Sequence, residues 1–91
     1  MKKVSIIVSC YNESAALPLF YSEISKILDL LPHYRFELIF VNDGSKDNTI
    51  SIIQELASQD SRIRYISFSR NFGKEAAMLA GLEHASGDLI T

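Results

Sequence analysis

The chain has 91 residues and a formal net charge of -2, and 47% of its residues are hydrophobic while 22% are charged. This length suits one compact domain or part of a larger one, and the composition is that of an ordinary globular protein, which excludes a disordered chain. Acidic and basic residues are mixed along the sequence, so it has no basic stripe for a nucleic acid and no polybasic patch for a membrane.

The N-terminal segment carries the single cysteine, Cys10, which excludes an internal disulfide and a cage of thiolate metal ligands. One unpaired cysteine is consistent with a reducing, cytoplasmic compartment. Two lysines precede an apolar run here, as in a signal peptide, but the run is short and polar residues follow it directly. No stretch reaches the ~20 apolar residues of a membrane-spanning helix. We therefore interpret the N-terminal run as a strand.

Apolar runs and helical periodicities alternate along the chain. Four runs have the length and β-branched content of buried parallel strands: 4–9, 36–41, 63–68 and the beginning of another at 89–91. Three segments between them repeat apolar residues at helical spacing: 17–31, 50–57 and 74–85. This order predicts an α/β fold with a parallel sheet, right-handed crossovers and helices on both faces.

Punctuating residues refine these boundaries. Pro32 stops the first helix, and Asp47 or Asn48 is the expected cap of the second. The third helix has a face of small residues that should pack closely on the sheet: Ala76, Ala77, Ala80 and Gly81. The fourth strand begins only at the last residues, so we expect residues 1–91 to be the N-terminal part of a single domain, a fragment truncated in that strand.

Ligands of open parallel sheets bind outside the carboxyl ends of the strands, where this sequence places the loops "SCYNE", "NDGS" and "SRNFGK". The first loop has no glycine, which excludes both the dinucleotide fingerprint G-x-G-x-x-G and a P-loop. It offers the aromatic face of Tyr11, the amide of Asn12 and the carboxylate of Glu13. These groups suit stacking on a base and hydrogen bonding to a ribose better than cradling a pyrophosphate.

Asp43 ends the second strand, where its carboxylate would accept a hydrogen bond from a base or a ribose. Gly44 supplies the backbone freedom that the following turn needs. Because "NDGS" is also ordinary turn chemistry, the spacing alone favours a turn cap over a ligand contact for this acid.

The third loop carries two cations, Arg70 and Lys74, that would neutralise a diphosphate, while Asn71 and Gly73 shape the loop. Basic residues are frequent in exposed loops, so the spacing alone favours ordinary surface cations here.

Taken together, "VSIIVSCYNE", "FELIFVNDGSKDNT" and "ISFSRNFGKEAAMLAGLEHASGDLI" resemble the N-terminal, nucleotide-binding half of a family 2 glycosyltransferase with the GT-A (Rossmann-like) fold. The resemblance covers almost the whole chain and is strongest to the polyprenyl-phosphate sugar transferases, which act on dolichyl or undecaprenyl phosphate. It implies transfer of a sugar from a nucleotide-diphosphate donor of the UDP or GDP type to a polyprenyl phosphate, with Mg or Mn as the cofactor.

The resemblance also implies roles for individual residues. The nucleotide-binding set is Ser9, Tyr11, Glu13 and Asp43, with Arg70 and Lys74 near the phosphates. Many relatives have proline where this chain has Cys10, which leaves the first loop less rigid.

The family binds its metal through an Asp-x-Asp motif beyond the fourth strand, and the sequence up to Thr91 contains none. We therefore expect no metal ligand and no catalytic residue within this chain, and negligible transfer by the fragment alone. The full-length protein is expected at the cytoplasmic face of the membrane, and a homo-oligomer is one assembly that the sequence leaves open. The alternative is a non-catalytic α/β module that binds a nucleotide or a protein, which predicts that no Asp-x-Asp pair follows in the gene.

Overall fold

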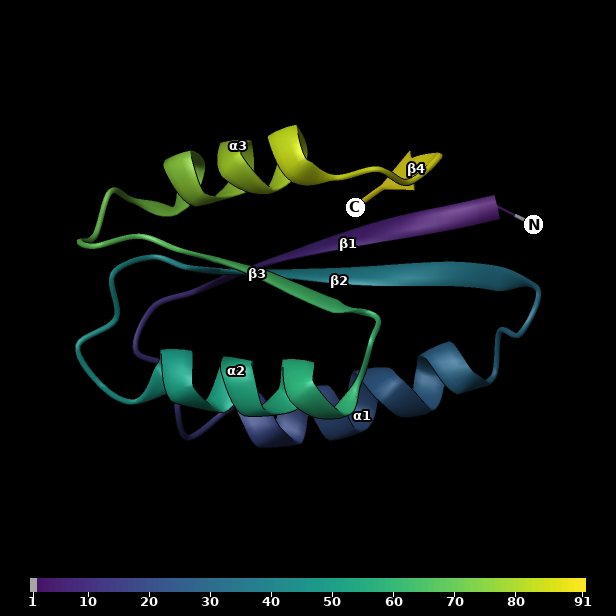
Figure 1. The fold of residues 1–91 in the computed structure, drawn as a ribbon, viewed down its shortest axis with the longest axis horizontal. Coiled ribbons are helices and arrows are strands. Elements are labelled where there is room, and N and C mark those ends of the chain that lie inside the picture. The colour runs from purple at the N-terminus through teal and green to yellow at the C-terminus, as the bar shows by residue number, and fades with distance from the viewer. Residues whose placement is uncertain (1) are drawn as a thin grey trace.

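The computed structural model describes residues 2–91. Its elements follow the predicted order (Figure 1): β1 (Lys2–Cys10), α1 (Leu17–Asp29), β2 (Tyr34–Asn42), α2 (Thr49–Gln59), β3 (Ile63–Ser67), α3 (Lys74–His84) and β4 (Leu89–Ile90). Helix α1 ends shortly before Pro32, as expected. Of the two expected caps of α2, Asn48 occupies the cap position but makes no side-chain hydrogen bond to the helix, whereas Oδ1 of Asp47 before it accepts the amide of Thr49 at 3.0 Å.

The strands form one parallel sheet in the order β3-β2-β1-β4. Helices α1 and α2 cover one face and α3 covers the other, which confirms the predicted α/β arrangement (Figure 1). The chain adds β2 and β3 on one side of β1 and then crosses to add β4 on the other. Strand order therefore reverses at β1, and the carboxyl ends of β1, β2 and β3 meet at the same edge of the sheet.

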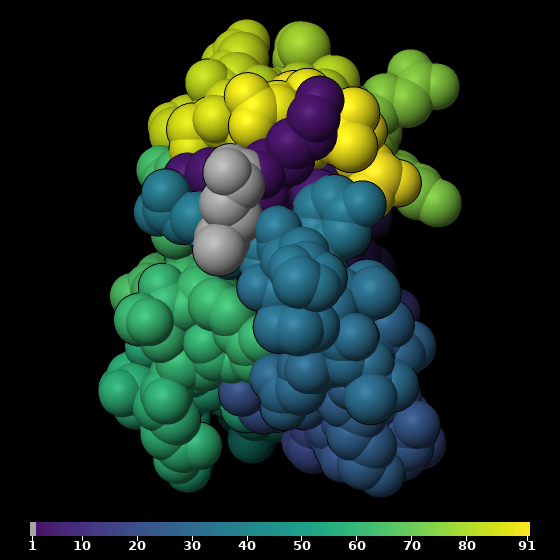
Figure 2. Space-filling model, turned by 90° about the vertical axis from the view of Figure 1, so that its right-hand side faces the viewer, coloured from purple at the N-terminus to yellow at the C-terminus, as the bar shows by residue number. Residues whose placement is uncertain are grey.

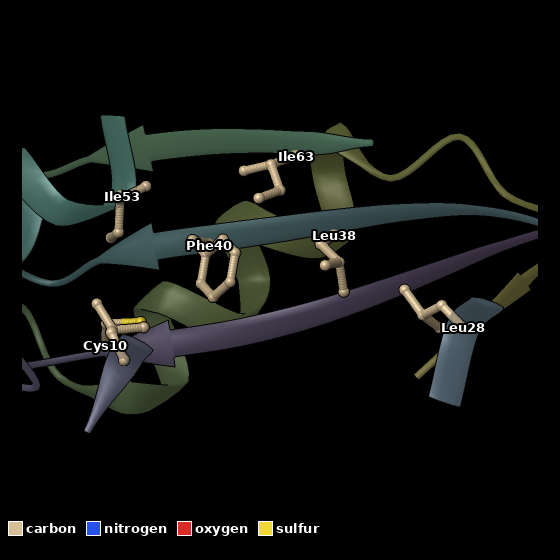
Figure 3. Close-up of a cluster of buried hydrophobic side chains, with 7 residues drawn as sticks. Cys10, Leu28, Leu38, Phe40, Ile53 and Ile63 are labelled. Carbon is tan, nitrogen blue, oxygen red and sulfur yellow. The ribbon is translucent and has the colours of Figure 1, made fainter. Parts of the chain in front are cut away.

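Alternation along β2 divides the core between the two faces of the sheet. One cluster lies between the sheet and helices α1 and α2 (Figure 3), and its buried members are Cys10, Leu17, Leu28, Leu38, Phe40, Ile53 and Ile63. The other cluster lies under α3 and contains Ile7, Ile39, Val41 and Ala77. Strand β2 is thus buried on both sides, as its apolar run predicted. The loops that follow the strands are therefore attached to a well-packed sheet.

Helix α3 approaches the sheet closely through its small residues. Ala77 is fully buried, and a Cβ atom added to Gly81 would lie 2.4 Å from Cγ2 of Ile7 in β1. That distance is too short for two carbon atoms that are not bonded, so a larger residue at position 81 would force the side chain of Ile7 to shift. The predicted small-residue face is confirmed, and it brings the second half of α3 close to Ile7 of β1.

Candidate functional site

A cleft of about 490 Å³ opens at the carboxyl ends of β1 and β2. Its lining residues come from three loops that are distant in sequence: Ser9, Cys10, Tyr11, Glu13, Asp43, Asn71, Gly73 and Lys74. The fold therefore brings the four residues of the expected nucleotide-binding set together with Lys74. Arg70 does not line this cleft. Its guanidinium carbon lies 4.7 Å from the centre of the Phe72 ring, in a cation–π contact.

The β1–α1 loop contributes an aromatic ring and a carboxylate to the cleft. Tyr11 is 42% exposed, and Glu13 is also exposed, so both side chains are available to a ligand. Asn12 between them has a φ of 53°, in the left-handed region that few residues other than glycine adopt. This backbone turn lets a loop without glycine fold back after β1.

Asp43 forms the floor of the cleft and is 3% exposed. Its Oδ1 accepts a hydrogen bond from the amide of Phe72 at 2.8 Å, and its Oδ2 accepts bonds from the amide of Gly73 at 3.1 Å and from Nδ2 of Asn71 at 3.2 Å. A carboxylate offers about four acceptor directions, so one remains for a ligand. The residue therefore holds the β3–α3 loop in place as well as lining the cleft.

Gly44 allows that loop to approach the end of β2. Its φ is 68°, and a Cβ atom added to it would lie 2.1 Å from the carbonyl carbon of Arg70 and 2.3 Å from the amide nitrogen of Asn71. The predicted need for a flexible backbone is confirmed, and a second constraint is added: the backbone of the β3–α3 loop occupies the space where a side chain would be.

Lys74 brings positive charge to the mouth of the cleft. It lines the cleft and is the first residue of α3, a helix end whose unpaired amides also carry partial positive charge. Gly73, which precedes it with a φ of 101°, closes the loop onto Asp43. This corner of the cleft is the most favourable place for an anionic group.

Cys10 is the one thiol among the residues that line the cleft. Burial, with a smaller contribution from the charge of Glu13, raises the pKa of its thiol to about 12. The thiol is therefore neutral at physiological pH and is no nucleophile, which agrees with its interpretation as a small apolar core residue.

The acids of the cleft do not make a metal centre by themselves. Across residues 2–91, no three side chains of His, Cys, Asp or Glu come together as ligands for one ion. Asp43 already accepts bonds from the β3–α3 loop, which leaves Glu13 as the one freely available carboxylate of the lining. These residues do not fit a divalent cation without further ligands.

A second groove, of about 560 Å³, lies at the opposite, amino end of the strands. Figure 2 looks onto this end, where the α1–β2 connection in blue lies beside the green start of β3. Two arginines of this groove are already paired within the chain: Arg62 lies 2.8 Å from Asp60, and Arg64 lies 2.9 Å from Glu37. The carboxyl-end cleft, with its open acceptor and free ammonium group, is therefore the better candidate for a ligand site.

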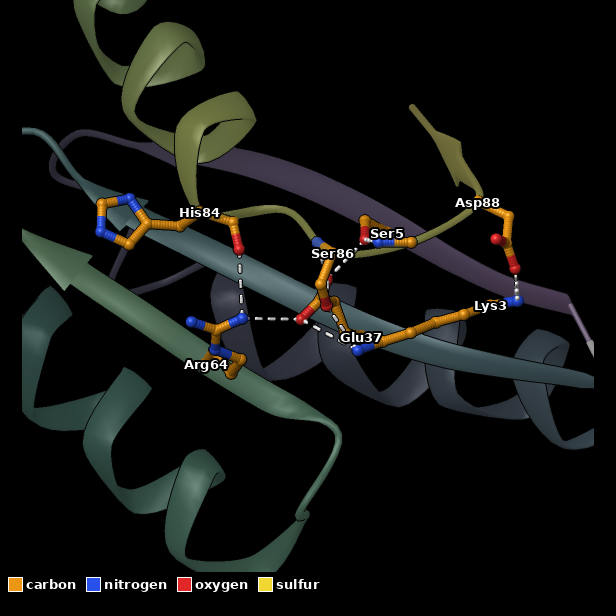
Figure 4. Close-up of polar contacts among 8 residues, drawn as sticks. Lys3, Ser5, Glu37, Arg64, His84, Ser86 and Asp88 are labelled. Carbon is orange, nitrogen blue, oxygen red and sulfur yellow. Dashed lines mark hydrogen bonds and ion pairs between the residues drawn. The ribbon is translucent and has the colours of Figure 1, made fainter.

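Glu37 is the main polar residue that the sequence analysis missed. It lies in the middle of the supposed apolar run, is 4% exposed, and accepts hydrogen bonds from Ser5 Oγ at 2.5 Å, the amide of Ser86 at 2.8 Å and Arg64 at 2.9 Å. Figure 4 shows how this carboxylate joins three strands to the α3–β4 connection. A signal was present in the sequence, because the runs 4–9 and 36–41 each have a polar residue at the second position, Ser5 and Glu37, and the sheet makes these two register partners.

The Glu37 network predicts a specific dependence of stability on pH. Burial alone raises the pKa of this carboxyl, but the bonds from Ser5, Ser86 and Arg64 outweigh burial and lower it from 4.5 to about 2. A pKa lowered by folding means that the carboxylate stabilises the fold above pH 4.5 and that this stabilisation is lost as the pH falls towards 2. Relative to the wild type, the Glu37→Gln variant should therefore have a lower free energy of unfolding. The difference should be largest at neutral pH and should shrink progressively below about pH 4.5.

Urea unfolding of both proteins at neutral pH and at about pH 3 measures this difference. Asp47 and Asp60 also have pKa values lowered to about 2, but both acids are present in the two proteins and cancel in the comparison. A loss of the same size at both pH values would contradict the charged network.

Comparison with known proteins identifies the family. The model of glycosyl transferase family 2 matches residues 5–91. The bactoprenol glucosyl transferase of Shigella phage SfV is 50% identical over 88 residues, which are 97% of this chain and 28% of that protein. The undecaprenyl-phosphate 4-deoxy-4-formamido-L-arabinose transferase of Shewanella sediminis is 41% identical over 96% of this chain and 26% of its own length. The chain thus spans less than a third of these relatives.

Solved structures agree with the predicted GT-A fold. The mannosyltransferase PcManGT from Pyrobaculum calidifontis, in complex with GDP-Man and Mn2+, superposes with a TM-score of 0.75 at 25% identity, over 98% of this chain and 26% of that one. Residues 1–349 of S. aureus TarS superpose with a TM-score of 0.69 at 23% identity, over 97% of this chain and 26% of that one, a likeness of fold alone. On the family match over residues 5–91, the chain belongs to glycosyl transferase family 2.

Proposed function

We propose that this chain is the nucleotide-sugar-binding, N-terminal part of a glycosyltransferase catalytic domain. The observation that carries the proposal is the cleft at the carboxyl ends of β1 and β2, where an aromatic ring, a free carboxylate, a buried carboxylate and an ammonium group face one space. These groups are chemically suited to the base, the ribose and the phosphates of a nucleoside diphosphate. Membership of the family supplies the reaction class.

In this proposal each group has one task. Tyr11 stacks on the base, Asp43 accepts a hydrogen bond from the base through its remaining acceptor direction, and Glu13 binds a ribose hydroxyl. Ser9, at the end of β1, completes that wall of the pocket. Lys74 and the start of α3 neutralise the diphosphate. Arg70 would have to leave the Phe72 ring to join it.

We further propose that the sugar acceptor of the full-length protein is a polyprenyl phosphate. Support comes from the similar transferases, whose names specify bactoprenol and undecaprenyl phosphate. In such a transfer an acceptor phosphate oxygen forms a bond to the anomeric carbon of the sugar, and the bond from that carbon to the nucleotide diphosphate breaks. Among residues 2–91 no helix is long and apolar enough to cross a bilayer. We therefore propose that the full-length protein meets the lipid at the cytoplasmic face of the membrane through other segments.

A divalent cation, Mg or Mn, belongs to the same proposal. PcManGT is in complex with Mn2+, and such an ion, when bound, stabilises the departing diphosphate. Because the described acids of this chain do not complete a metal centre, we propose that its ligands lie elsewhere in the full-length protein.

Nucleotide titration tests the proposal. Calorimetry of the full-length protein with UDP, GDP, UDP-glucose and GDP-mannose, with Mg or Mn present, is expected to give binding by one nucleotide class. The Tyr11→Ala variant should bind that nucleotide at least about tenfold more weakly, because it loses a stacking partner of the base.

Tyr65→Ala is the matched control, since Tyr65 has the same 42% exposure as Tyr11 but does not line the cleft. Absence of binding by all four compounds would overturn the proposed function, and equal losses in the two tyrosine variants would remove Tyr11 from the site.

A further inference from the structure

Three consecutive backbone amides in the β1–α1 loop donate to side chains of the β2–α2 loop and of the first residue of α2. The bonds run from Asn12 to Ser45 Oγ at 2.9 Å, from Glu13 to Thr49 Oγ1 at 3.0 Å, and from Ser14 to Asp47 Oδ2 at 3.3 Å. We call these three amides and the side chains of Ser45, Asp47 and Thr49 the clasp. It joins segments that are more than 30 residues apart in the sequence.

The acceptors of the clasp are themselves connected. Thr49 is fully buried, and its hydroxyl donates to Asp47 Oδ1 while it accepts the amide of Glu13. Asp47 also accepts the hydroxyl of Ser14 at 2.8 Å, and Oδ1 of Asn12 accepts the amide of Lys46 at 2.8 Å. Every side-chain oxygen of Thr49 and Asp47 that faces the β1–α1 loop is therefore paired. This pairing favours a single arrangement of the β1–α1 loop relative to the β2–α2 connection.

The side chains of the clasp do not line the cleft, but they act on residues that do. Tyr11 and Glu13 flank Asn12, whose left-handed backbone is one that asparagine tolerates but does not adopt exclusively, so an external hold selects it. Hydrogen bonds to the amides of residues 12 and 13 supply that hold, from a loop anchored on the buried end of β2.

The clasp also determines what the first loop can bind. In folds that cradle a pyrophosphate, free backbone amides of this loop point at the phosphate oxygens. Here the carboxylate of Asp47 and two hydroxyl groups occupy the amides of residues 12–14. The loop can therefore offer a ligand the side chains of Tyr11 and Glu13 but not these amides, and a diphosphate is directed to the Lys74 side of the cleft.

We propose that Ser45, Asp47 and Thr49 are positioning residues of the donor site: they bind the amides of residues 12–14 and so hold Tyr11 and Glu13 in the geometry that receives the nucleoside. This inference rests on the proposed function. The clasp is distinct from the ligand contacts themselves, because none of its three side chains lines the cleft.

The test compares Thr49→Val with Thr49→Ser in the full-length protein. Valine has nearly the shape of threonine but cannot pair with the amide of Glu13 or with Asp47, whereas serine keeps the hydroxyl. For Thr49→Val, hydrogen exchange at residues 12–14 should accelerate about tenfold, and UDP or GDP, whichever the wild type binds, should bind about tenfold more weakly. The donor KM should rise by the same factor while kcat stays within about twofold, because the loss lies in binding geometry.

Thr49→Ser should restore the exchange rate, the affinity and the KM. Ser58→Ala is the matched control: it removes a hydroxyl from the same helix, one that bonds to the carbonyl of Glu55 and has no contact with the clasp. It should leave all three quantities unchanged. If Thr49→Val does not fold, Asp47→Asn and Ser45→Ala take its place, because they alter clasp residues that are less buried. In each of them, hydrogen exchange at residues 12–14 should accelerate severalfold and the nucleotide should bind severalfold more weakly.

The outcomes separate the two proposals. A folded Thr49→Val protein with wild-type exchange at residues 12–14, or with wild-type nucleotide affinity, overturns the clasp as a positioning device and leaves the proposed function standing. A wild-type protein that binds no nucleotide overturns the proposed function, and the positioning role with it. Loss of affinity that serine does not rescue also overturns the inference, because the hydroxyl is then not the cause.

Discussion

Replacing Asp43 by alanine is expected to lower the free energy of unfolding by about 3 kcal/mol, because it removes a buried charged acceptor of several hydrogen bonds. The amides of Phe72 and Gly73 and the side-chain amide of Asn71 would lose their partner together. The β3–α3 loop should then separate from the end of β2. Urea unfolding followed by circular dichroism measures the loss, and hydrogen exchange locates it at residues 71–73.

Asp29→Ala is the control for Asp43→Ala. The Asp29 side chain is 73% exposed and lies 3.3 Å from Arg62, a surface ion pair whose removal should change stability by less than about 1 kcal/mol. Equal effects in the two variants would contradict the anchoring role of Asp43. Asp43→Asn should lie between them, because an amide oxygen can still accept the bond from Phe72 but the amide nitrogen faces donors on the other side.

The same substitution bears on the proposed donor site. Asp43→Asn should weaken nucleotide binding about tenfold or more if the base donates a hydrogen bond to this carboxylate. Affinity that is unchanged in the folded Asn variant would assign Asp43 to the anchoring role alone, which is the turn-cap interpretation that its sequence spacing favours.

Gly44→Ala is the second change with a large expected effect. A methyl group there would meet the carbonyl carbon of Arg70 and the amide of Asn71 at 2.1 and 2.3 Å, and the backbone φ of 68° would be strained as well. Neither neighbour is the end of a flexible side chain, so the β3–α3 loop would have to move. The combined cost should be about 3 kcal/mol or more in the free energy of unfolding.

Gly73→Ala separates the two causes. Gly73 also has a positive φ, of 101°, but an added Cβ atom would meet nothing within 4 Å. It should show only the backbone cost, which is itself large at a φ of 101° and a ψ of 157°, so hydrogen exchange rather than total stability distinguishes the variants: exchange at residues 70 and 71 should accelerate more in Gly44→Ala. If exchange at residues 70 and 71 accelerates equally in both variants, the close approach of the β3–α3 loop is not what requires glycine at position 44.

The order and type of the elements were predictable because each rests on a local pattern. Apolar runs bounded by turn residues gave the strands, and the periodicity of residues 17–31 gave α1. The small-residue face of α3 was predictable for the same reason, since Ala77 and Gly81 lie one turn apart and must share a side. The position of the cleft followed from the general geometry of parallel sheets.

The partners of the polar residues were not predictable in this way. Glu37 binds Ser86, which lies 49 residues away, and only the folded sheet brings the two together. The stacking of Arg70 on Phe72 and the bonds from residues 71–73 to Asp43 depend on the path of one loop. A sequence pattern shows that such a group is polar, but the tertiary fold decides whether it meets a ligand or another part of the chain.

The double duty of Asp43 has a consequence for how relatives of this protein could diversify. An acid that holds a loop as well as lining a binding site is costly to exchange. A substitution there would destabilise the fold, and selection would remove it before any change in ligand preference could be of use. The side chains of Tyr11 and Glu13 do not hold the fold together, because they are exposed and their loop is held through its backbone amides. Preference for one donor over another is therefore expected to evolve at positions 11 and 13 while position 43 stays fixed. Engineering of a new donor preference should begin with those two side chains.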